Sequence, residues 1–305
     1  MAEIFFLKPL LVYEMWGSDN LKDFNIDLSG ANDVGEAYLI CGNKNKSTII
    51  LNGTYKNKSL YEVFHTHKEL FDNYESNKYP LMVKVLDVNQ NLSVQVHPTA
   101  EIAKKYNDIA STKCWYILKS KPESQVICGH NAKTKEELKE MIQNDQWEKL
   151  LAYKPVKTGD VLYVPDGCVH AINEGNVVYT VQEPTDVVFK LYSYNRDLFD
   201  AESYKLNVDE AIETINCPHT EAKFLYDGPV LFDNGKYKIV KIVNKQKLIH
   251  HFQDARWIQA TVIDGRAKLE GLYEISKGNS FVIASDTKSF ELDGDITLLV
   301  SYIKK

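Results

Sequence analysis

The residues best suited to chemistry are three polar side chains in the segment NLSVQVHP at residues 91–98. Ser93, Gln95 and His97 alternate with two valines, so on a β-strand the three polar side chains share one face. A face made of a hydroxyl, an amide and an imidazole is poor material for a hydrophobic core. It is suited to binding a metal ion or a polar ligand, and the segment therefore predicts part of a site.

A second histidine, His170, lies in a similar setting within GDVLYVPDGCVHAI, with Cys168 two residues earlier. Two histidines from separate strands, together with an amide or a carboxylate, are a recurrent arrangement for a metal site with positions open to substrate. The alternative is that His97 and His170 are core histidines with satisfied hydrogen bonds. We expect structural or solvated roles for the other histidines, which are His65, His67, His130, His219, His250 and His251.

The composition excludes several classes of protein. Of the 305 residues, 26% are charged and 44% hydrophobic, and the net charge is −6, which predicts a soluble globular protein without the basic surface that nucleic acid or an anionic membrane requires. No apolar run approaches the roughly 20 residues of a membrane span, and the N-terminus does not resemble a signal peptide. The five scattered cysteines favour reduced thiols in a cytoplasmic protein.

Short strand-like segments dominate the chain, among them YPLMVKVLDV, KCWYILKS, SQVICGH, NVVYTVQE and VVFKLYSY. Such spacing predicts a mainly β fold of the sandwich or barrel type. Helices are expected at residues 59–71 and 134–151, each opening with a capping box, and at residues 208–215.

The character of the sequence changes after Pro218, where a new series of strand-like segments begins. We therefore predict one domain over residues 1–215 and a smaller one over residues 216–305. The segments GDVLYVPDGCVHAI and KGNSFVIASDTKSF have weak internal similarity, which is compatible with one architecture in both domains. The second segment has no counterpart of His170, so the smaller domain is expected to be structural.

The motifs FLKP…WG, VKVLDVNQNLSVQVHP, TKCWYIL, CGHNAKTKEELKEMI and GDVLYVPDGCVHAI resemble class I mannose-6-phosphate isomerase (phosphomannose isomerase) in its short bacterial form. The resemblance follows the same order across nearly the whole chain. It implies a cupin fold, a jelly-roll β-barrel with helical insertions and a second, smaller cupin-like domain. The implied reaction is the zinc-dependent interconversion of mannose 6-phosphate and fructose 6-phosphate, an aldose–ketose isomerisation.

The resemblance also assigns residues. It implies Gln95, His97 and His170 as zinc ligands, and Lys84 and Lys190 as catalytic residues. Ser93 and Lys113 are assigned by position to substrate binding.

Three positions depart from the motifs of the family. Lys113 stands where the family has a glutamate ligand, Thr180 where it has a glutamate, and Lys190 where it has an arginine. At roughly 4 Å and an effective dielectric near 20, each elementary charge facing a divalent ion is worth about 8 kcal/mol, so an ammonium in place of a carboxylate should weaken zinc binding greatly. Thr180 cannot serve as an acid or base at neutral pH, and Lys190 lacks the planar fork of arginine.

Three outcomes are open for Lys113. Its side chain could turn aside or lose its proton, leaving Gln95, His97 and His170 to hold zinc. Its ammonium group could instead occupy the metal position. Alternatively, the Cys168 thiolate could replace the lost ligand.

Three functions follow. The first is a working zinc-dependent isomerase with a rearranged site. The second is a non-catalytic relative, a pseudoenzyme, whose lysines (Lys84, Lys113 and Lys190) attract a hexose 6-phosphate. The third is a cupin with another metal and another chemistry, which no residue specifically favours.

Overall fold

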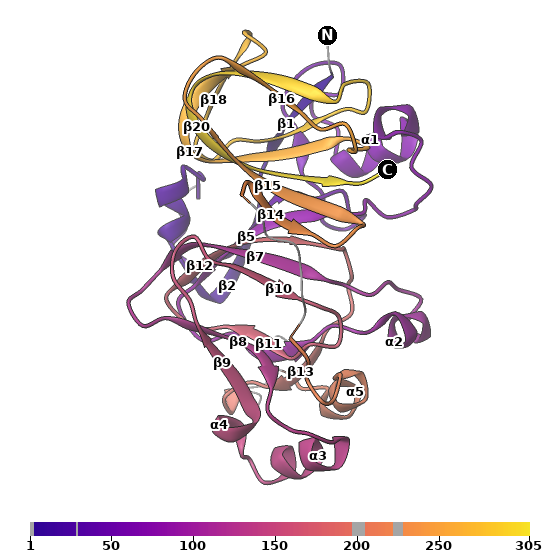
Figure 1. Ribbon diagram of the computed structural model, residues 1–305, viewed down its shortest axis with the longest axis vertical. Coiled ribbons are helices and arrows are strands. Elements are labelled where there is room, and N and C mark those ends of the chain that lie inside the picture. The colour runs from indigo at the N-terminus through magenta and orange to yellow at the C-terminus, as the bar shows by residue number, and fades with distance from the viewer. Residues whose placement is uncertain (1–2, 29, 197–204, 222–227) are drawn as a thin grey trace. The chain divides into compact units, whose positions relative to one another are not determined.

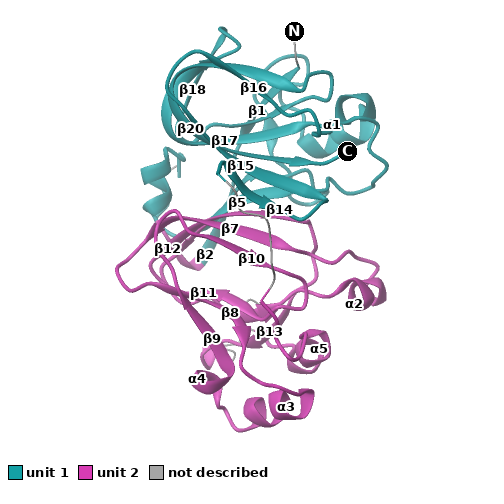
Figure 2. Cartoon of the chain, viewed as in Figure 1, with its two compact units in different colours: residues 1–14, 19–85, 224–305 teal, residues 15–18, 86–223 magenta. Residues whose placement is uncertain are grey.

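The structure is a computed structural model that describes residues 3–28, 30–196, 205–221 and 228–305 (Figure 1). The chain forms two compact units (Figure 2): unit 1 comprises residues 1–14, 19–85 and 224–305, and unit 2 comprises residues 15–18 and 86–223. Residues 224–305, which belong to the predicted C-terminal domain, therefore share unit 1 with two segments from the N-terminal part of the chain. The boundary between domains 1–215 and 216–305 stays a prediction.

Unit 1 contains an antiparallel sheet in the order β14-β15-β20-β17-β19-β1-β4, with β16 paired to β20 and β18 paired to β17. Its strands are β1 (Ile4–Lys8), β4 (Ile49–Ile50), β14 (Val230–Asp233), β15 (Tyr237–Asn244), β16 (Leu248–His251), β17 (Ile258–Leu269), β18 (Tyr273–Ser276), β19 (Ser280–Ile283) and β20 (Ser289–Ile303). Unit 1 also holds η1 (Asn20–Phe24), β3 (Val34–Ile40), α1 (Leu60–Thr66) and η2 (Lys68–Phe71), while β2 (Leu10–Ser18) and β5 (Met82–Val88) continue from unit 1 into unit 2.

Strands β17 and β20 are longer than the sequence predicted. The sequence segments WIQATVID and AKLEG predict two strands where the structure has β17, and SFELDG and ITLLVSYI predict two where it has β20. Both strands instead continue through the glycine. Gly265 and Gly294 have φ values of 77° and 144°, and a Cβ atom would lie 2.3 Å from the Asp295 carbonyl oxygen at Gly265 and 2.7 Å from the Arg266 carbonyl oxygen at Gly294. These glycines therefore permit close backbone approach inside a continuous pair of strands.

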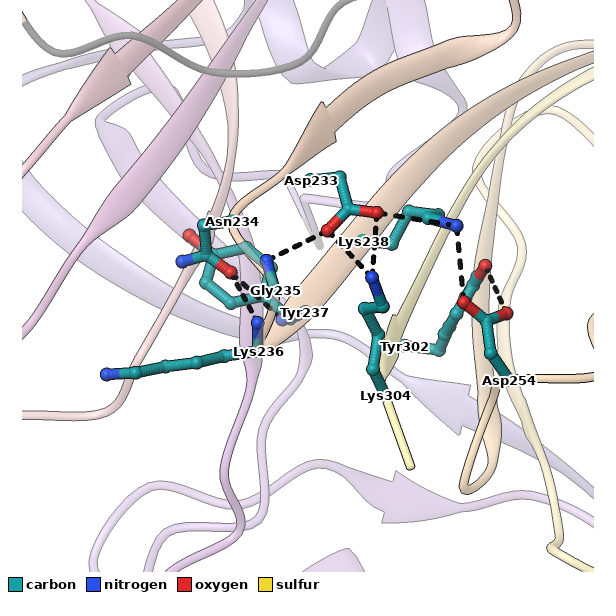
Figure 3. A network of polar contacts seen from close by, with 9 residues as sticks. All are labelled: Asp233, Asn234, Gly235, Lys236, Tyr237, Lys238, Asp254, Tyr302 and Lys304. Atoms are coloured by element: carbon teal, nitrogen blue, oxygen red, sulfur yellow. Dashed lines mark hydrogen bonds and ion pairs between the residues drawn. The ribbon is translucent and has the colours of Figure 1, made fainter.

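A network of charged side chains joins three strands of unit 1 (Figure 3). The Asp233 carboxylate at the end of β14 accepts hydrogen bonds from Lys304, at 3.0 Å, and faces Lys238 of β15 at 3.4 Å. Lys238 also donates to Asp254 at 3.2 Å, and the Tyr302 hydroxyl of β20 donates to the same carboxylate at 2.9 Å. Each of these carboxylates is thus paired with lysine, which suits a structural role.

Unit 2 contains a five-stranded antiparallel sheet in the order β13-β6-β11-β8-β9 and the antiparallel strands β10-β7-β12. The strands are β6 (Val94–Val96), β7 (Lys113–Ser120), β8 (Gln125–His130), β9 (Leu151–Pro155), β10 (Val161–Val164), β11 (His170–Ile172), β12 (Asn176–Gln182) and β13 (Phe189–Tyr192). The helices are α2 (Ala100–Lys105), α3 (Lys135–Gln143), α4 (Trp147–Leu150) and α5 (Val208–Thr214).

The two faces of the five-stranded sheet bury different side chains. The outer face packs against α3 and α5 through a cluster that includes Val94, Val96, Ile127, Ala171 and Leu191. The inner face packs against β7, β10 and β12 through a second cluster that includes Cys128, Ile172, Trp115, Ile117 and Val178. Because side chains alternate between faces along a strand, the residues between these can be assigned to the outer or the inner face wherever the strand register is regular.

The predicted fold class, mainly β, is confirmed, although the helices are shorter than predicted. The 59–71 segment forms α1 and then η2, with a break at His67. The 134–151 segment forms α3 and α4, and Asp145 between them has a φ of 52°. No helix in the described ranges has the length and apolar character that crossing a membrane requires.

Candidate active site

Three of the residues singled out from the sequence lie in one row across the inner face of unit 2. Gln95 of β6 is the register partner of His170 on β11 and of Lys190 on β13. Directly opposed residues of antiparallel strands point to the same side of a sheet. His97, two residues after Gln95 and just beyond the end of β6, continues the same face.

Lys113 reaches this region from the opposing strands. It begins β7, two residues before Trp115 and four before Ile117, both of which belong to the inner cluster. Its register partner on β12 is Gln182, and that of Trp115 is Thr180. The alternation of β7 and β12 therefore directs Lys113, Thr180 and Gln182 into the interior between the strands.

The Lys113 ammonium group lies between two imidazole rings. Its Nζ atom is 2.6 Å from His97 Nε2 and 3.2 Å from His170 Nε2. The two rings are stacked, with centroids 5.4 Å apart and planes inclined by 19°. All three side chains are buried, with exposed fractions of 6% for Lys113, 7% for His97 and 1% for His170. The arrangement is a buried lysine held by two histidines.

The backbone fixes the tautomer of both histidines. His97 Nδ1 lies 2.9 Å from the Val187 carbonyl oxygen, and His170 Nδ1 lies 2.9 Å from the Cys168 carbonyl oxygen. A carbonyl oxygen can only accept a hydrogen bond, so each Nδ1 carries the proton and each Nε2 presents a lone pair to Lys113. Burial, together with the charge of Lys113, holds the pKa of His170 well below its usual range, which keeps this ring neutral.

Two further polar groups of the interior lack a hydrogen-bond partner among the residues that the structure describes. They are Thr180 Oγ1 and Gln182 Oε1, on side chains that are only 1% and 3% exposed. The Trp115 ring lies close by, with its centroid 5.8 Å from that of His170. Sequence reasoning missed Gln182, although its spacing from Thr180 in VVYTVQE is the signal that places both on one face. These buried oxygens can accept hydrogen bonds from a polar ligand or from water.

Comparison with known sequences identifies the family of this chain. Mannose-6-phosphate isomerase ManA of Bacillus subtilis (strain 168) is 31% identical over 320 residues, which covers 99% of each chain. The chain belongs to the mannose-6-phosphate isomerase family. The enzyme of Streptococcus mutans is 32% identical over 99% of each chain. The family model for the phosphomannose isomerase type I catalytic domain matches residues 6–130, and that for the mannose-6-phosphate isomerase cupin domain matches residues 238–303.

Solved structures confirm the predicted cupin fold. The crystal structure of the Bacillus subtilis mannose 6-phosphate isomerase superposes with a TM-score of 0.90 at 29% identity and covers 98% of this chain and 99% of that one. A zinc-bound mannose 6-phosphate isomerase superposes with a TM-score of 0.79 at 13% identity, over 99% of this chain and 100% of that chain. The second comparison shows the shared fold alone.

The residues of this family member do not fit a zinc ion in the arrangement described. Zinc bound by both imidazoles would lie about 2.0–2.1 Å from each Nε2 atom, and the Lys113 ammonium already faces both of these atoms at hydrogen-bond distance. Like charges at such close range repel strongly. Within the described residues, no group of three or more His, Cys, Asp or Glu side chains is placed to hold a metal ion.

The structure gives no support to Cys168 as a replacement ligand. Its Sγ atom lies 3.9 Å from Cys128 Sγ in the inner cluster, and it is the backbone carbonyl of Cys168, rather than the thiol, that contacts His170. The hydrogen bond with Cys128, together with burial, raises the pKa of the Cys168 thiol well above its usual range. The metal-binding thiolate is therefore disfavoured.

The two other predicted site residues have different surroundings. Lys84, a predicted catalytic residue, lies on β5 in unit 1, where its Nζ atom donates to the Glu36 carboxylate at 2.6 Å. Burial alone would raise the pKa of Glu36, but the charge of Lys84 and its hydrogen bond lower it. Ser93 is half-buried just before β6 and shares the face of Gln95. The roles of Lys84 and Ser93 stay predictions.

Proposed function

We propose that this protein binds a hexose 6-phosphate in the interior of unit 2 and does not isomerise it by a zinc-dependent route. The observation that carries the proposal is the position of Lys113 Nζ between His97 Nε2 and His170 Nε2. The two imidazoles would bind a metal ion through the lone pairs of these Nε2 atoms. Both lone pairs instead face the Lys113 ammonium group at hydrogen-bond distance.

The chemistry of isomerisation supports the same conclusion. Moving a proton between C1 and C2 of a sugar requires a group that accepts and returns it, and a cation that stabilises the developing enediolate. Thr180 offers a hydroxyl, which is not a base at neutral pH. The two imidazole nitrogens that carry lone pairs are hydrogen-bonded to Lys113. Of these residues, Lys113 supplies a cation and none of the others is poised to move the proton.

The same interior is suited to binding. Lys113 and Lys190 place two ammonium groups on inner-facing positions, which attract a phosphorylated sugar. The unpartnered oxygens of Thr180 and Gln182 can accept hydrogen bonds from sugar hydroxyls. The Trp115 ring supplies an apolar surface of the kind that sugar rings contact.

A second candidate is the isomerisation of mannose 6-phosphate and fructose 6-phosphate with one zinc ion. The similarity to isomerases over 99% of the chain favours it, as does the placement of Gln95 and His170 in one row. This function requires the Lys113 side chain to leave both imidazoles so that zinc can take its place. Lys84 and Lys190 would then act on the substrate, as the family resemblance implies.

A binding assay and a turnover assay on the same sample separate the two functions. We expect mannose 6-phosphate or fructose 6-phosphate to raise the melting temperature more than mannose or inorganic phosphate does, and to show no turnover with added zinc. Turnover with zinc would establish the second candidate. An unchanged melting temperature with both sugar phosphates would overturn the proposed binding.

Lys190 provides the matched test of the binding site. Losing a charge-assisted hydrogen bond of about 1.5–3 kcal/mol should weaken hexose 6-phosphate binding by about tenfold or more in Lys190→Met. Lys119→Met removes the same group from an exposed position on β7 and should leave affinity unchanged. Equal effects of the two substitutions would show that binding depends on overall charge rather than on this site.

A further inference from the structure

We infer that Lys113 is a built-in cation that occupies the metal position of this site, and that exchanging it for a ligand creates a zinc site. The inference deepens the metal-free part of the proposed function and rests on it. It makes one residue responsible for the absence of metal binding, with the remaining ligands already in place.

The orientation of the two imidazoles is that of metal ligands. Histidines that bind metal usually donate their second ring N–H to a carbonyl or carboxylate, which fixes the tautomer and the direction of the ring. His97 and His170 both do so, through the Val187 and Cys168 carbonyl oxygens at 2.9 Å. The backbone has therefore already aligned two lone pairs on a common point, and that point lies near Lys113 Nζ.

The Lys113 ammonium group is positively charged, as a metal ion is, and it faces the same two Nε2 atoms that would bind the metal. Its distances to the two Nε2 atoms, 2.6 and 3.2 Å, are those of hydrogen bonds and are longer than the roughly 2.0–2.1 Å of zinc–imidazole bonds. A cation centred between the same two lone pairs would overlap the ammonium group. Lys113 and a metal ion therefore exclude each other.

The rest of the site is compatible with metal once Lys113 is exchanged. Gln95 shares a register row with His170, so an amide oxygen belongs to the same face as both imidazoles. A glutamate at position 113 would start from the same inner-facing position on β7 and carry a carboxylate. Two imidazoles, one carboxylate and one amide form a donor set that zinc accepts.

The test compares zinc binding by wild type, Lys113→Glu and Lys119→Glu. Each purified protein is equilibrated with zinc chloride, freed of unbound metal and measured by elemental analysis, and its affinity is measured by titration. We expect Lys113→Glu to retain about one zinc per chain and to bind it at least about 100-fold more tightly than wild type. Lys119→Glu makes the same charge change at an exposed position of β7 and should behave as wild type.

Lys113→Met separates occupation of the site from gain of a ligand. It removes the ammonium group without supplying a donor, so its affinity for zinc should lie between those of wild type and Lys113→Glu. An affinity equal to that of wild type would show that Lys113 does not block the metal. Lys113→Cys supplies a thiolate ligand and gives the same readout if circular dichroism shows that Lys113→Glu does not fold.

The inference can fail independently of the proposed binding function. Wild-type protein that retains one zinc per chain would overturn the inference, as would a folded Lys113→Glu variant with no gain in zinc affinity. Wild-type protein that binds neither zinc nor a hexose 6-phosphate would overturn the proposed binding and leave the role of Lys113 intact.

Discussion

At the scale of single residues, Thr180 has a buried hydroxyl group that bears on ligand binding. Its side chain is 1% exposed, and its hydroxyl has no hydrogen-bond partner in the described part of the chain. A buried polar group without a partner carries a desolvation penalty of about 1–3 kcal/mol. A ligand or a water molecule that hydrogen-bonds to the hydroxyl removes this penalty, and Thr180 lies on the inner face beside Trp115.

The substitution Thr180→Val tests this interpretation, because valine has nearly the shape of threonine without the hydroxyl. We expect the ligand-free variant to be as stable as wild type or more stable by about 1 kcal/mol, as measured by urea unfolding. The same variant should show a smaller rise in melting temperature with mannose 6-phosphate. A loss of more than about 1 kcal/mol in the ligand-free state would mean that the hydroxyl has a structural partner.

Part of the site could be predicted at the residue scale and part could not. Alternation in NLSVQVHP was enough to place Gln95 and His97 on one face, and the similar setting of His170 in GDVLYVPDGCVHAI singled out that histidine. The family motifs pointed to Lys113. The contact of Lys113 with both histidines depends on the register of β7 against β12 and on the conformation of a long side chain. Neither is encoded in local spacing, so the ammonium position stood as one of three alternatives.

At the scale of elements, the start of helix α1 is fixed by hydrogen bonds between Ser59 and Glu62 in its first turn. The Ser59 hydroxyl accepts a hydrogen bond from the Glu62 amide at 3.1 Å, and the Glu62 carboxylate accepts one from the Ser59 amide at 2.8 Å. This confirms the capping box predicted from the sequence. In α3 the Thr134 hydroxyl caps the Glu137 amide, but the Glu137 carboxylate accepts from Lys133 instead, so only half of the predicted box forms there.

Removing the α1 cap should destabilise the protein by a defined amount. We expect Ser59→Ala to lower the free energy of unfolding by about 1 kcal/mol, because the Glu62 amide loses the Ser59 hydroxyl that accepts its hydrogen bond. Thr66→Ala, at the exposed end of the same helix, should change it by less than about 0.5 kcal/mol. Urea unfolding followed by circular dichroism measures both, and equal effects would contradict the role of the cap.

The lengths of elements were the least predictable feature of the fold. Local pattern indicated where strands and helices lie, but the two longest strands, β17 and β20, were divided at glycines that in fact allow one backbone to pass close to another. That role of glycine depends on a neighbour far away in sequence. In the same way, Leu151 was assigned to a helix because its spacing is helical, whereas it begins β9 and pairs with β8.

At the scale of the whole molecule, buried and half-buried histidines of both units link stability to pH. Burial is the main cause that lowers the pKa of His130 and His219 in unit 2 and of His250 in unit 1. An unfolded histidine titrates near pH 6.5, so below that pH the unfolded chain binds more protons than the folded chain. The stability that these three histidines contribute is therefore fully present above about pH 6.5 and is lost as the pH falls through the folded-state pKa values.

His130 allows this linkage to be tested with one substitution. Its Nε2 atom donates to the Asn216 carbonyl oxygen at 2.9 Å, while its Nδ1 atom is buried without a partner in the described ranges. The nearby positive charge of Lys135 also lowers the pKa of His130. His130→Gln keeps a side-chain donor but cannot titrate. Between about pH 7.5 and 5.5 it should therefore lose less free energy of unfolding than wild type does.

The matched control for His130→Gln is His251→Gln, which alters an exposed histidine of β16. Its free energy of unfolding should fall with pH in parallel with that of wild type, when each protein is unfolded by urea across the same pH series. A His130→Gln curve that also runs parallel to wild type would show that the buried ring accepts a proton in the folded protein. In that case the acid sensitivity of the molecule would have to come from other groups.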